Sequence, residues 1–365
     1  MTERLTTLHN ELKANNLDSI LVTSSANVYY LSNHYTDPHE RVIAVYVSRF
    51  HDPLLIIPAL EKEDAKSAGW EYDMIAYSDS ENPWGLFQQF LKQNDSFPVS
   101  TAVEQNHLTM ERFHQIKSVL PDTTFSNAQE ILANLRVIKS KQERDLLKTA
   151  AELADFGIET GIRSINEGVS ELEIIAQIEY ELKKQGVQQM SFSTMALSGA
   201  KTASPHGTPS MKKIEKGDLV LFDLGVVFEG YCSDITRTVA YQSISPEQKT
   251  IYHTVLEAET KAISASKQGT AVGEIDSAAR KHIEQAGYGD FFLHRVGHGL
   301  GIETHEYPSM HGQNRLPLQT GMCYTIEPGI YVPGQGGVRI EDMIFITDEG
   351  AETLTKSPKE LQIVD

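Results

Sequence analysis

The stretch FDLGVVFEGYCSDITRT, residues 222–238, decides the fold because it places two aspartates where a buried core is expected. Asp223 lies in an apolar run, LVLFDLGVVF at 219–228, that predicts a buried strand. Asp234 is expected on the return strand, beyond a Glu-Gly turn at 229–230. Two carboxylates would then lie close together inside the protein, where an unpaired carboxylate costs several kcal/mol.

The same pattern occurs a second time further along the chain. The segments GDLVLFD (217–223) and GMCYTIE (321–327) each begin with a glycine and end on an acidic residue. A glycine-rich turn, PGQGG at 333–337, then predicts a hairpin that brings Glu341 near Glu327 across the ladder. Four carboxylates are therefore expected to meet in one core.

Pairs of helical segments precede both strands. One pair is expected at 140–164 and 170–185, and the other begins at the capping box SPEQ (245–248) and ends near Gly287. This internal repeat predicts that residues 126–365 form one α+β domain with pseudo-twofold symmetry.

Residues 1–125 follow a different pattern. Short apolar strands alternate with helical stretches, which is typical of an α/β domain. The strands are expected at 19–24, 41–48, 53–59 and 74–79. A long helical pattern takes over between 122 and 137, and we divide the chain at 125/126.

Composition excludes several classes of partner. The chain has 32 basic and 50 acidic residues and a net charge of −18, which argues against nucleic acid or an anionic membrane surface as a target. Cys232 and Cys323 lie far apart, so neither a disulfide framework nor a zinc cage is indicated. No segment is apolar for 18 residues, and a cytoplasmic protein is expected.

Four buried carboxylates require cations. Arg237 and Arg339 are the local basic side chains, and two cannot balance four. A pair of divalent metal ions can, and shared carboxylates would hold them roughly 3.5–4 Å apart. Oxygen-rich ligation favours manganese, with cobalt or zinc as alternatives. His298, between two glycines in RVGHGLG, is the candidate imidazole ligand.

In this order and spacing, the candidate ligands resemble those of the pita-bread metallopeptidases, the M24 family of methionine aminopeptidase, aminopeptidase P and prolidase. The residues are Asp223, Asp234, His298, Glu327 and Glu341, in the phrases DLG, DITRT, VGHGLG, EPGIY and RIED. The α/β domain resembles the creatinase-type N-terminal domain, which methionine aminopeptidase lacks. Its segments YTDPHERV, IPALEKEDAK, GWEYDMIAY and ENPW are similar to those of bacterial prolidases, the Xaa-Pro dipeptidases.

The resemblance implies a dinuclear metallopeptidase that hydrolyses Xaa-Pro dipeptides with a metal-bridging hydroxide as nucleophile. Glu327 would be both a ligand and the proton shuttle. His206, in SPHGTPS, and His305, seven residues after His298, would hydrogen-bond the substrate amide or the tetrahedral intermediate. The alternative for either histidine is a solvent-facing loop position.

Two strand residues are expected to face the site. Arg339 precedes Glu341 by two positions and Tyr331 follows Glu327 by four, so alternation along a strand places each on the face of its ligand. A structural guanidinium that neutralises a nearby carboxylate is the alternative for Arg339. Core packing is the alternative for Tyr331.

The segment YTDPHER, residues 35–41, is a charged turn by its residues alone. In the bacterial prolidases that this chain resembles, the same loop covers the active site of the other subunit of a homodimer. Asp37 and His39 would then meet the N-terminal residue of the substrate, and His294 and Arg295 would line the same pocket.

Other functions remain open at this point. Aminopeptidase P, which acts on longer Xaa-Pro peptides, shares the ligand pattern. A non-catalytic peptide-binding protein on the same fold would not need an intact ligand set. A dimetal phosphatase should offer more basic groups. The zincin motif HExxH fails at His305-Glu306, because position 309 is serine.

Overall fold

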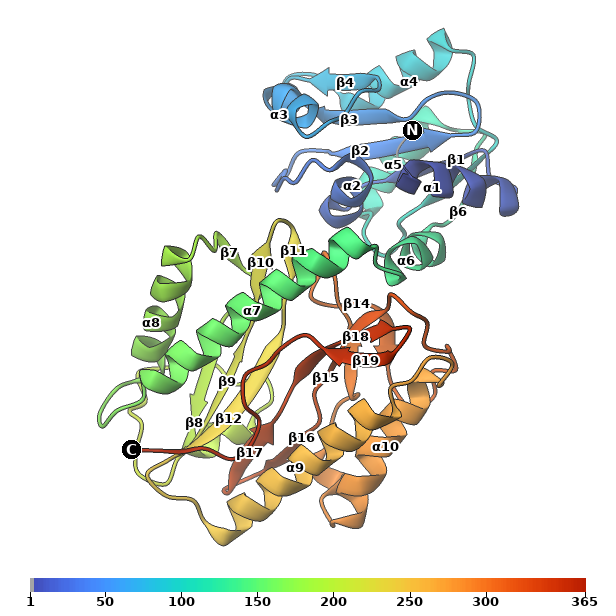
Figure 1. The fold of residues 1–365 in the computed structure, drawn as a ribbon. Helices are drawn as coiled ribbons and strands as arrows, with labels where there is room; N and C mark the ends of the chain where they lie inside the picture. The colour runs from blue at the N-terminus through green and yellow to red at the C-terminus, as the bar shows by residue number, and fades with distance from the viewer. Residues whose placement is uncertain (1–2) are drawn as a thin grey trace. The chain divides into compact units, whose positions relative to one another are not determined.

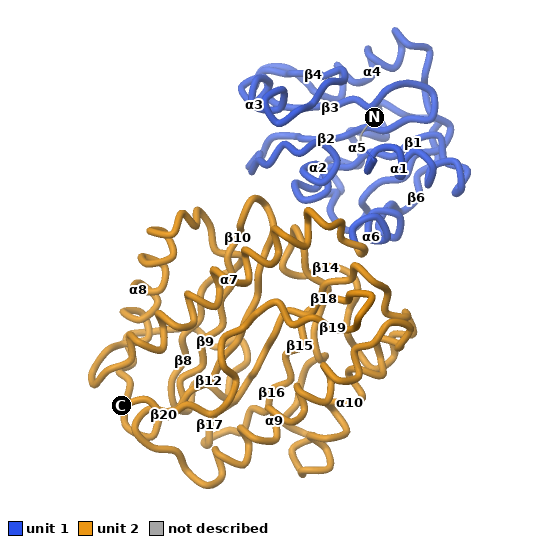
Figure 2. The backbone as a smooth tube through the Cα atoms, in the orientation of Figure 1, with its two compact units in different colours: residues 1–136 blue, residues 137–365 orange. Residues whose placement is uncertain are grey.

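The computed structural model describes residues 3–365, which divide into two compact units at 136/137 (Figure 2). The boundary lies beyond the expected 125/126 because the intervening residues pack with the first unit. The Arg136 guanidinium donates to Asn27 Oδ1 at 2.8 Å, and the Tyr30 hydroxyl donates to the Leu135 carbonyl at 2.7 Å. These long-range contacts leave no local signal in the sequence.

The first unit is an α/β domain, as expected (Figure 1). Its sheet has the order β4-β3-β2-β1-β5-β6, and β2 is antiparallel to both of its neighbours. The strands are β1 (Ser19–Val22), β2 (Ala44–Ser48), β3 (Leu54–Pro58), β4 (Met74–Tyr77), β5 (Ser100–Val103) and β6 (Thr124–Asn127). The helices are α1 (Glu3–Ala14), α2 (Ser25–Ser32), α3 (Lys62–Ser67), α4 (Pro83–Gln93), α5 (Met110–Val119) and α6 (Gln129–Val137), with a 3₁₀ turn η1 (Ala59–Glu61). The four strands expected from the sequence are confirmed.

Two helix pairs frame the second unit. They are α7 (Lys141–Arg163) with α8 (Glu171–Lys184), and α9 (Pro246–Ala265) with α10 (Val272–Gln285). Ser140, Ser170 and Ser245 each begin a helix with a capping box, in which the serine and the third helical residue satisfy each other's backbone N–H. Each pair packs on the strands of its own half, and this confirms the α+β domain with an internal repeat (Figure 1).

Two principal sheets carry the candidate ligands, in the orders β20-β12-β9-β8 and β14-β13-β15-β18-β19. The first half supplies β7 (Gln189–Met190), β8 (Met195–Ser198), β9 (Leu219–Leu224), β10 (Val226–Phe228), β11 (Tyr231–Cys232) and β12 (Ile235–Tyr241). The second supplies β13 (Gly297–Gly299), β14 (Glu306–Met310), β15 (Cys323–Ile326), β16 (Gly329–Val332), β17 (Gly336–Arg339), β18 (Asp342–Thr347) and β19 (Gly350–Thr353). A short turn η2 (Gly199–Ala203) lies between β8 and β9, and η3 (Gly289–Phe291) lies between α10 and β13.

The C-terminal strand β20 (Ile363–Val364) returns to the first half and pairs in parallel with β12. The carbonyls of Gln362 and Val364 accept from the N–H groups of Ala240 and Gln242, at 2.9 and 2.7 Å. The end of the chain therefore covers the edge of β12.

The first hairpin turns where the sequence indicates. Glu229 and Gly230 both have positive φ, 45° and 80°, as a two-residue turn between right-twisted strands requires. The two aspartates are near neighbours, as expected, although they do not lie directly opposite each other. Asp223 lies opposite Thr236, and Asp234 lies in a break between β11 and β12. The break frees the Asp234 side chain from the strict alternation of a strand.

The two half-sheets meet at the ligand positions. Glu341 lies between β17 and β18, and its N–H donates to the Thr236 carbonyl at 3.1 Å. Glu327 lies between β15 and β16, on the other arm of the same hairpin. None of the helices within residues 3–365 combines the length and the apolar character needed to cross a bilayer.

Candidate metal centre

Three buried side chains form a group that could hold a metal ion. Asp234, His298 and Glu341 each offer one ligand atom, and these atoms lie within 4.8 Å of one another. The Nε2 atom of His298 lies 3.7 Å from Asp234 Oδ2 and 3.4 Å from Glu327 Oε1. The structure therefore brings together carboxylates from both hairpins and the histidine between them.

Asp223 joins this group through an arginine. One of its carboxylate oxygens accepts from Arg339 Nη2, while Oδ1 is buried and has no hydrogen-bond partner within residues 3–365. A buried acceptor left unpaired is costly unless a cation or a water satisfies it. The free oxygen of Asp223 and the donor set around His298 fit a divalent cation.

Without a cation, burial and mutual repulsion disfavour the ionised form of these carboxylates. Burial raises the pKa of Asp234 well above its usual range, and the neighbouring carboxylates of Glu341 and Asp223 raise it further. Burial likewise raises the pKa of Glu341 well above normal and that of Glu327 to about 7. Each shift expresses the cost of placing several negative charges in one dry core.

His298 is held as a neutral ligand donor. Its Nδ1–H donates to the Gly299 carbonyl at 3.1 Å, so the lone pair of Nε2 faces the carboxylates. Burial lowers the pKa of His298 to about 3, followed in effect by the nearby His305. The flanking glycines have a steric reason, because a Cβ at Gly297 would lie 1.9 Å from the Thr325 carbonyl oxygen.

A hydrogen-bonded chain leads away from Asp223. Arg339 pairs with Asp223 and donates from Nη1 to the Tyr331 hydroxyl at 3.0 Å. The Tyr331 hydroxyl lies 2.9 Å from Nε2 of His294, whose Nδ1–H donates to the Arg295 carbonyl at 2.8 Å. Burial lowers the pKa of His294 to about 4, so it accepts from Tyr331 as a neutral imidazole.

Two further histidines approach the same space. The His305 ring contacts the His298 ring with centroids 4.1 Å apart, and burial lowers its pKa. His206 lies exposed on the segment before β9, and its charge helps to lower the pKa of both His294 and His305. Arg295 donates from Nη1 to the Ser309 hydroxyl at 2.7 Å.

Asp37 and His39 belong to the first unit. Their side chains are 81% and 72% exposed, and Asp37 Oδ1 accepts from the His39 N–H at 3.1 Å. His39 has φ +53° at this turn. Arg41 makes a bidentate ion pair with Asp79, at 2.8 and 3.0 Å, which fixes the end of the loop.

The structure distinguishes the two local arginines and adds one residue. Arg237 does not face the candidate ligands: its Nη2 pairs with Asp342 at 2.7 Å and Nη1 donates to the Glu341 carbonyl at 2.6 Å. Thr236 was missed in the sequence, although it follows Asp234 by two positions in DITRT. Its hydroxyl donates to Glu341 Oε2 at 2.7 Å and accepts from Arg339 Nε at 3.0 Å.

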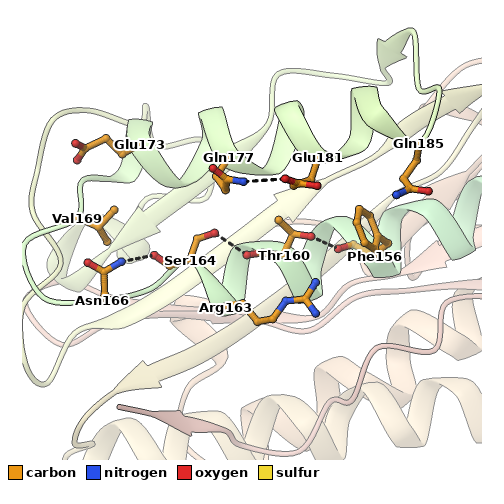
Figure 3. Close-up of a pocket in the computed structure, with 10 residues that line it drawn as sticks. All are labelled: Phe156, Thr160, Arg163, Ser164, Asn166, Val169, Glu173, Gln177, Glu181 and Gln185. Carbon is orange, nitrogen blue, oxygen red and sulfur yellow. Dashed lines mark hydrogen bonds between the residues drawn. The ribbon is translucent and has the colours of Figure 1, made fainter.

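A separate surface hollow lies between α7 and α8 (Figure 3). Polar side chains dominate its lining, including Arg163, Glu173 and Gln177. None of the candidate ligands or histidines contributes to it, so this hollow is distinct from the metal-binding group.

Comparisons with known proteins agree with this geometry. The model of metallopeptidase family M24 matches residues 145–348, and that of the creatinase/prolidase N-terminal domain matches residues 4–138. A putative dipeptidase of Bacillus subtilis is 51% identical over 94% of either chain, and an Xaa-Pro dipeptidase of Lactobacillus delbrueckii subsp. lactis is 41% identical over 98% of either chain. The solved Xaa-Pro dipeptidase from Bacillus anthracis superposes with a TM-score of 0.92 at 36% identity, covering 99% of both chains.

Proposed function

The chain belongs to metallopeptidase family M24, and on this premise we propose that it hydrolyses Xaa-Pro dipeptides. The observation that carries the proposal is the buried group of Asp234, His298 and Glu341, joined by the carboxylates of Glu327 and Asp223. The pita-bread fold of the protein and its creatinase/prolidase N-terminal domain are those of a metallopeptidase. Relatives named Xaa-Pro dipeptidase match nearly the whole chain, which supports the dipeptide substrate.

Two divalent metal ions per chain are part of the proposal. Asp223, Asp234, His298, Glu327 and Glu341 would hold them, and manganese suits this oxygen-rich set, with cobalt or zinc as alternatives. When bound, such ions supply Lewis-acid polarisation of the scissile carbonyl and lower the pKa of water towards neutrality. Support comes from the unpaired Oδ1 of Asp223 and from the Nε2 lone pair of His298, which faces the carboxylates.

The chain's own residues would move the protons and bind the substrate. Glu327, next to His298 at 3.4 Å, would be both a ligand and a proton shuttle. His305 and His206 would donate hydrogen bonds to the substrate carbonyl and stabilise the negative charge that develops on its oxygen. The contact of the His305 ring with His298 supports this role.

The hydrogen-bonded side chains of His294, Tyr331 and Arg339 would line the substrate pocket and hold Asp223 in place. Arg295 would lie on the side of the substrate's N-terminal residue. The Tyr331 hydroxyl links the neutral imidazole to the guanidinium, so its removal would loosen both ends of the chain.

A homodimer in the cytoplasm completes the proposal. Cys232 and Cys323 are both buried, which suits a reducing compartment. The exposed Asp37 and His39 would contact the substrate in the partner's site. A mixed dimer of an Asp37→Ala/His39→Ala chain and a Glu327→Ala chain should then regain activity, and no rescue on mixing would refute this role.

The decisive experiment is hydrolysis of Ala-Pro, Leu-Pro, Leu-Leu and Leu-Pro-Pro by the purified chain with added manganese. We expect cleavage of the two Xaa-Pro dipeptides. Preferred cleavage of Leu-Pro-Pro would identify an aminopeptidase P instead. A protein that binds two metal ions and the peptides but cleaves none of them would be a binding protein on this fold.

A further inference from the structure

The segment that carries His206, residues 199–210, is held by one carboxylate. Glu171, the first residue of α8, is fully buried and reaches both ends of this segment. Its Oε1 accepts from the N–H and hydroxyl of Ser198, at 2.8 and 2.9 Å. Its Oε2 accepts from the N–H and hydroxyl of Ser210, at 2.8 and 3.2 Å, and from Lys201 Nζ.

The position of Glu171 is itself fixed by the helix. Its N–H donates to the Lys212 carbonyl at 3.1 Å, and the Leu172 N–H donates to the Ser210 carbonyl at 3.3 Å. A carboxylate at the first turn of a helix is also favoured by the helix dipole. The side chain therefore forms a rigid anchor from which the His206 segment extends.

The opposite side of the segment rests on the second hairpin. The Gly337 N–H donates to the Thr202 hydroxyl at 2.7 Å, and that hydroxyl donates to the Gly199 carbonyl at 2.7 Å. A Cβ at Gly337 would lie 2.1 Å from the Thr202 carbonyl oxygen, so the hairpin requires glycine at this point. The segment is thus fixed near Thr202 and at both ends, while the His206 side chain stays exposed.

We propose that Glu171 is a positioning residue for His206. This inference rests on the proposed function, in which His206 binds the substrate carbonyl. Glu171 closes the segment by joining Ser198 to Ser210, and thereby fixes the direction from which the imidazole approaches the metal-binding group. A displacement of about 1 Å at a reacting group can cost on the order of 10²-fold in rate, so the anchor matters although it touches no substrate.

The test is a double-mutant cycle on the manganese-loaded enzyme. Glu171→Gln keeps the shape of the side chain but removes the charge and two of its acceptor positions. In the wild-type background we expect kcat for Leu-Pro to fall about 10- to 100-fold with bound metal unchanged. In a His206→Ala background the same substitution should change kcat by less than about twofold, because its effect passes through the missing imidazole.

Glu173→Gln is the matched control. Glu173 lies two residues further along the same helix and contacts Ser170 and Lys213, outside the His206 segment. It should leave kcat near the wild-type value. If Glu171→Gln does not fold, Lys201→Met takes its place in the cycle, because it releases the segment at one point and keeps the bonds from Glu171 to both serines.

Amide hydrogen exchange separates this inference from the proposed function. Glu171→Gln should speed exchange in residues 199–210 whether or not the enzyme cleaves any peptide. Unchanged exchange there would overturn the positioning role by itself. An equal loss of kcat in both backgrounds would also overturn it, because a merely structural defect does not depend on His206. Absence of hydrolysis by the wild-type chain would count against the proposed function. Amide hydrogen exchange in residues 199–210 would then still decide whether Glu171 anchors this segment.

Discussion

In the first half of the second unit, the imidazole of His206 is exposed on a loop; in the second half, His298 is 2% exposed and lies within β13. Both halves otherwise share a helix pair, a strand that leads to a carboxylate, and a hairpin. The first half contributes Asp223 and Asp234 to the candidate metal-binding group, and no imidazole. The two copies of an internal repeat can thus keep the same backbone arrangement while only one of them supplies a candidate imidazole ligand.

The helices show the same divergence. Glu259 in α9 lies as many residues after Ser245 as Ala154 in α7 lies after Ser140. Ala154 packs in an apolar core, whereas Glu259 is fully buried beside Asp342, and Lys359 pairs with both carboxylates. The second half therefore carries buried charge at a position where the first half carries a methyl group.

Removal of one carboxylate from each half tests whether the halves serve one centre. Asp234→Ala and Glu327→Ala should both abolish hydrolysis and lower bound metal, because each removes a ligand and leaves its neighbours unbalanced. Metal analysis and turnover of Leu-Pro measure both effects. Glu257→Ala, an exposed carboxylate on α9, is the control. Two ions per chain with full activity in either ligand variant would refute the assignment.

The unequal burial of the histidines leads to the second prediction. His305→Ala and His206→Ala should each keep the metal and lose on the order of 10²–10⁴ in kcat, the usual contribution of a positioned proton donor or oxyanion partner. His253→Ala, an exposed histidine on α9, should have no effect. If only His305→Ala is impaired, the exposed imidazole of the first half is an ordinary loop residue. Loss of metal in either variant would make that histidine a ligand.

The smallest effect concerns stability and the contrast between Glu259 and Ala154. Burial, followed by the nearby Asp342, raises the pKa of Glu259 from 4.5 to about 8. Between these values the folded state binds more protons than the unfolded state, so the free energy of unfolding falls as pH rises. We expect this residue to contribute a loss on the order of a few kcal/mol from about pH 5 to pH 8.

Urea unfolding at both pH values, for the wild type and Glu259→Gln, measures this contribution. The glutamine cannot titrate, so its stability should change less with pH. Glu257→Gln, an exposed position on the same helix, should follow the wild type. Parallel pH dependences for the wild type and Glu259→Gln would show that Glu259 is ionised in the folded protein.

Local signals in the sequence account for most of the fold. The capping box at Ser170 and the turn at Glu229-Gly230 each depend on neighbours a few residues away, and each is confirmed. The two compact units divide at 136/137 and not at 125/126, because Arg136 is held by Asn27, and a contact between distant residues leaves no local signal.

The candidate site was predictable in part. The orphan carboxylates follow from hydrophobic patterning, whereas the roles of His206 and His305 came from family resemblance and stay predictions. Arg237 and Arg339 cannot be told apart locally, because only the three-dimensional pairing shows that one faces Asp342 and the other Asp223. The break at Asp234 is also a property of the assembled sheets.

The short strand β20 determines how the protein tolerates changes at its C-terminal end. Ile363 and Val364 pair with Ala240 and Tyr241, the last two residues of β12. A chain that lost these residues would expose the backbone N–H and C=O groups at the end of β12, a template for pairing with a second molecule. Proteolytic trimming there would therefore favour aggregation without removing any candidate metal ligand, and fusion tags should leave this strand free to pair.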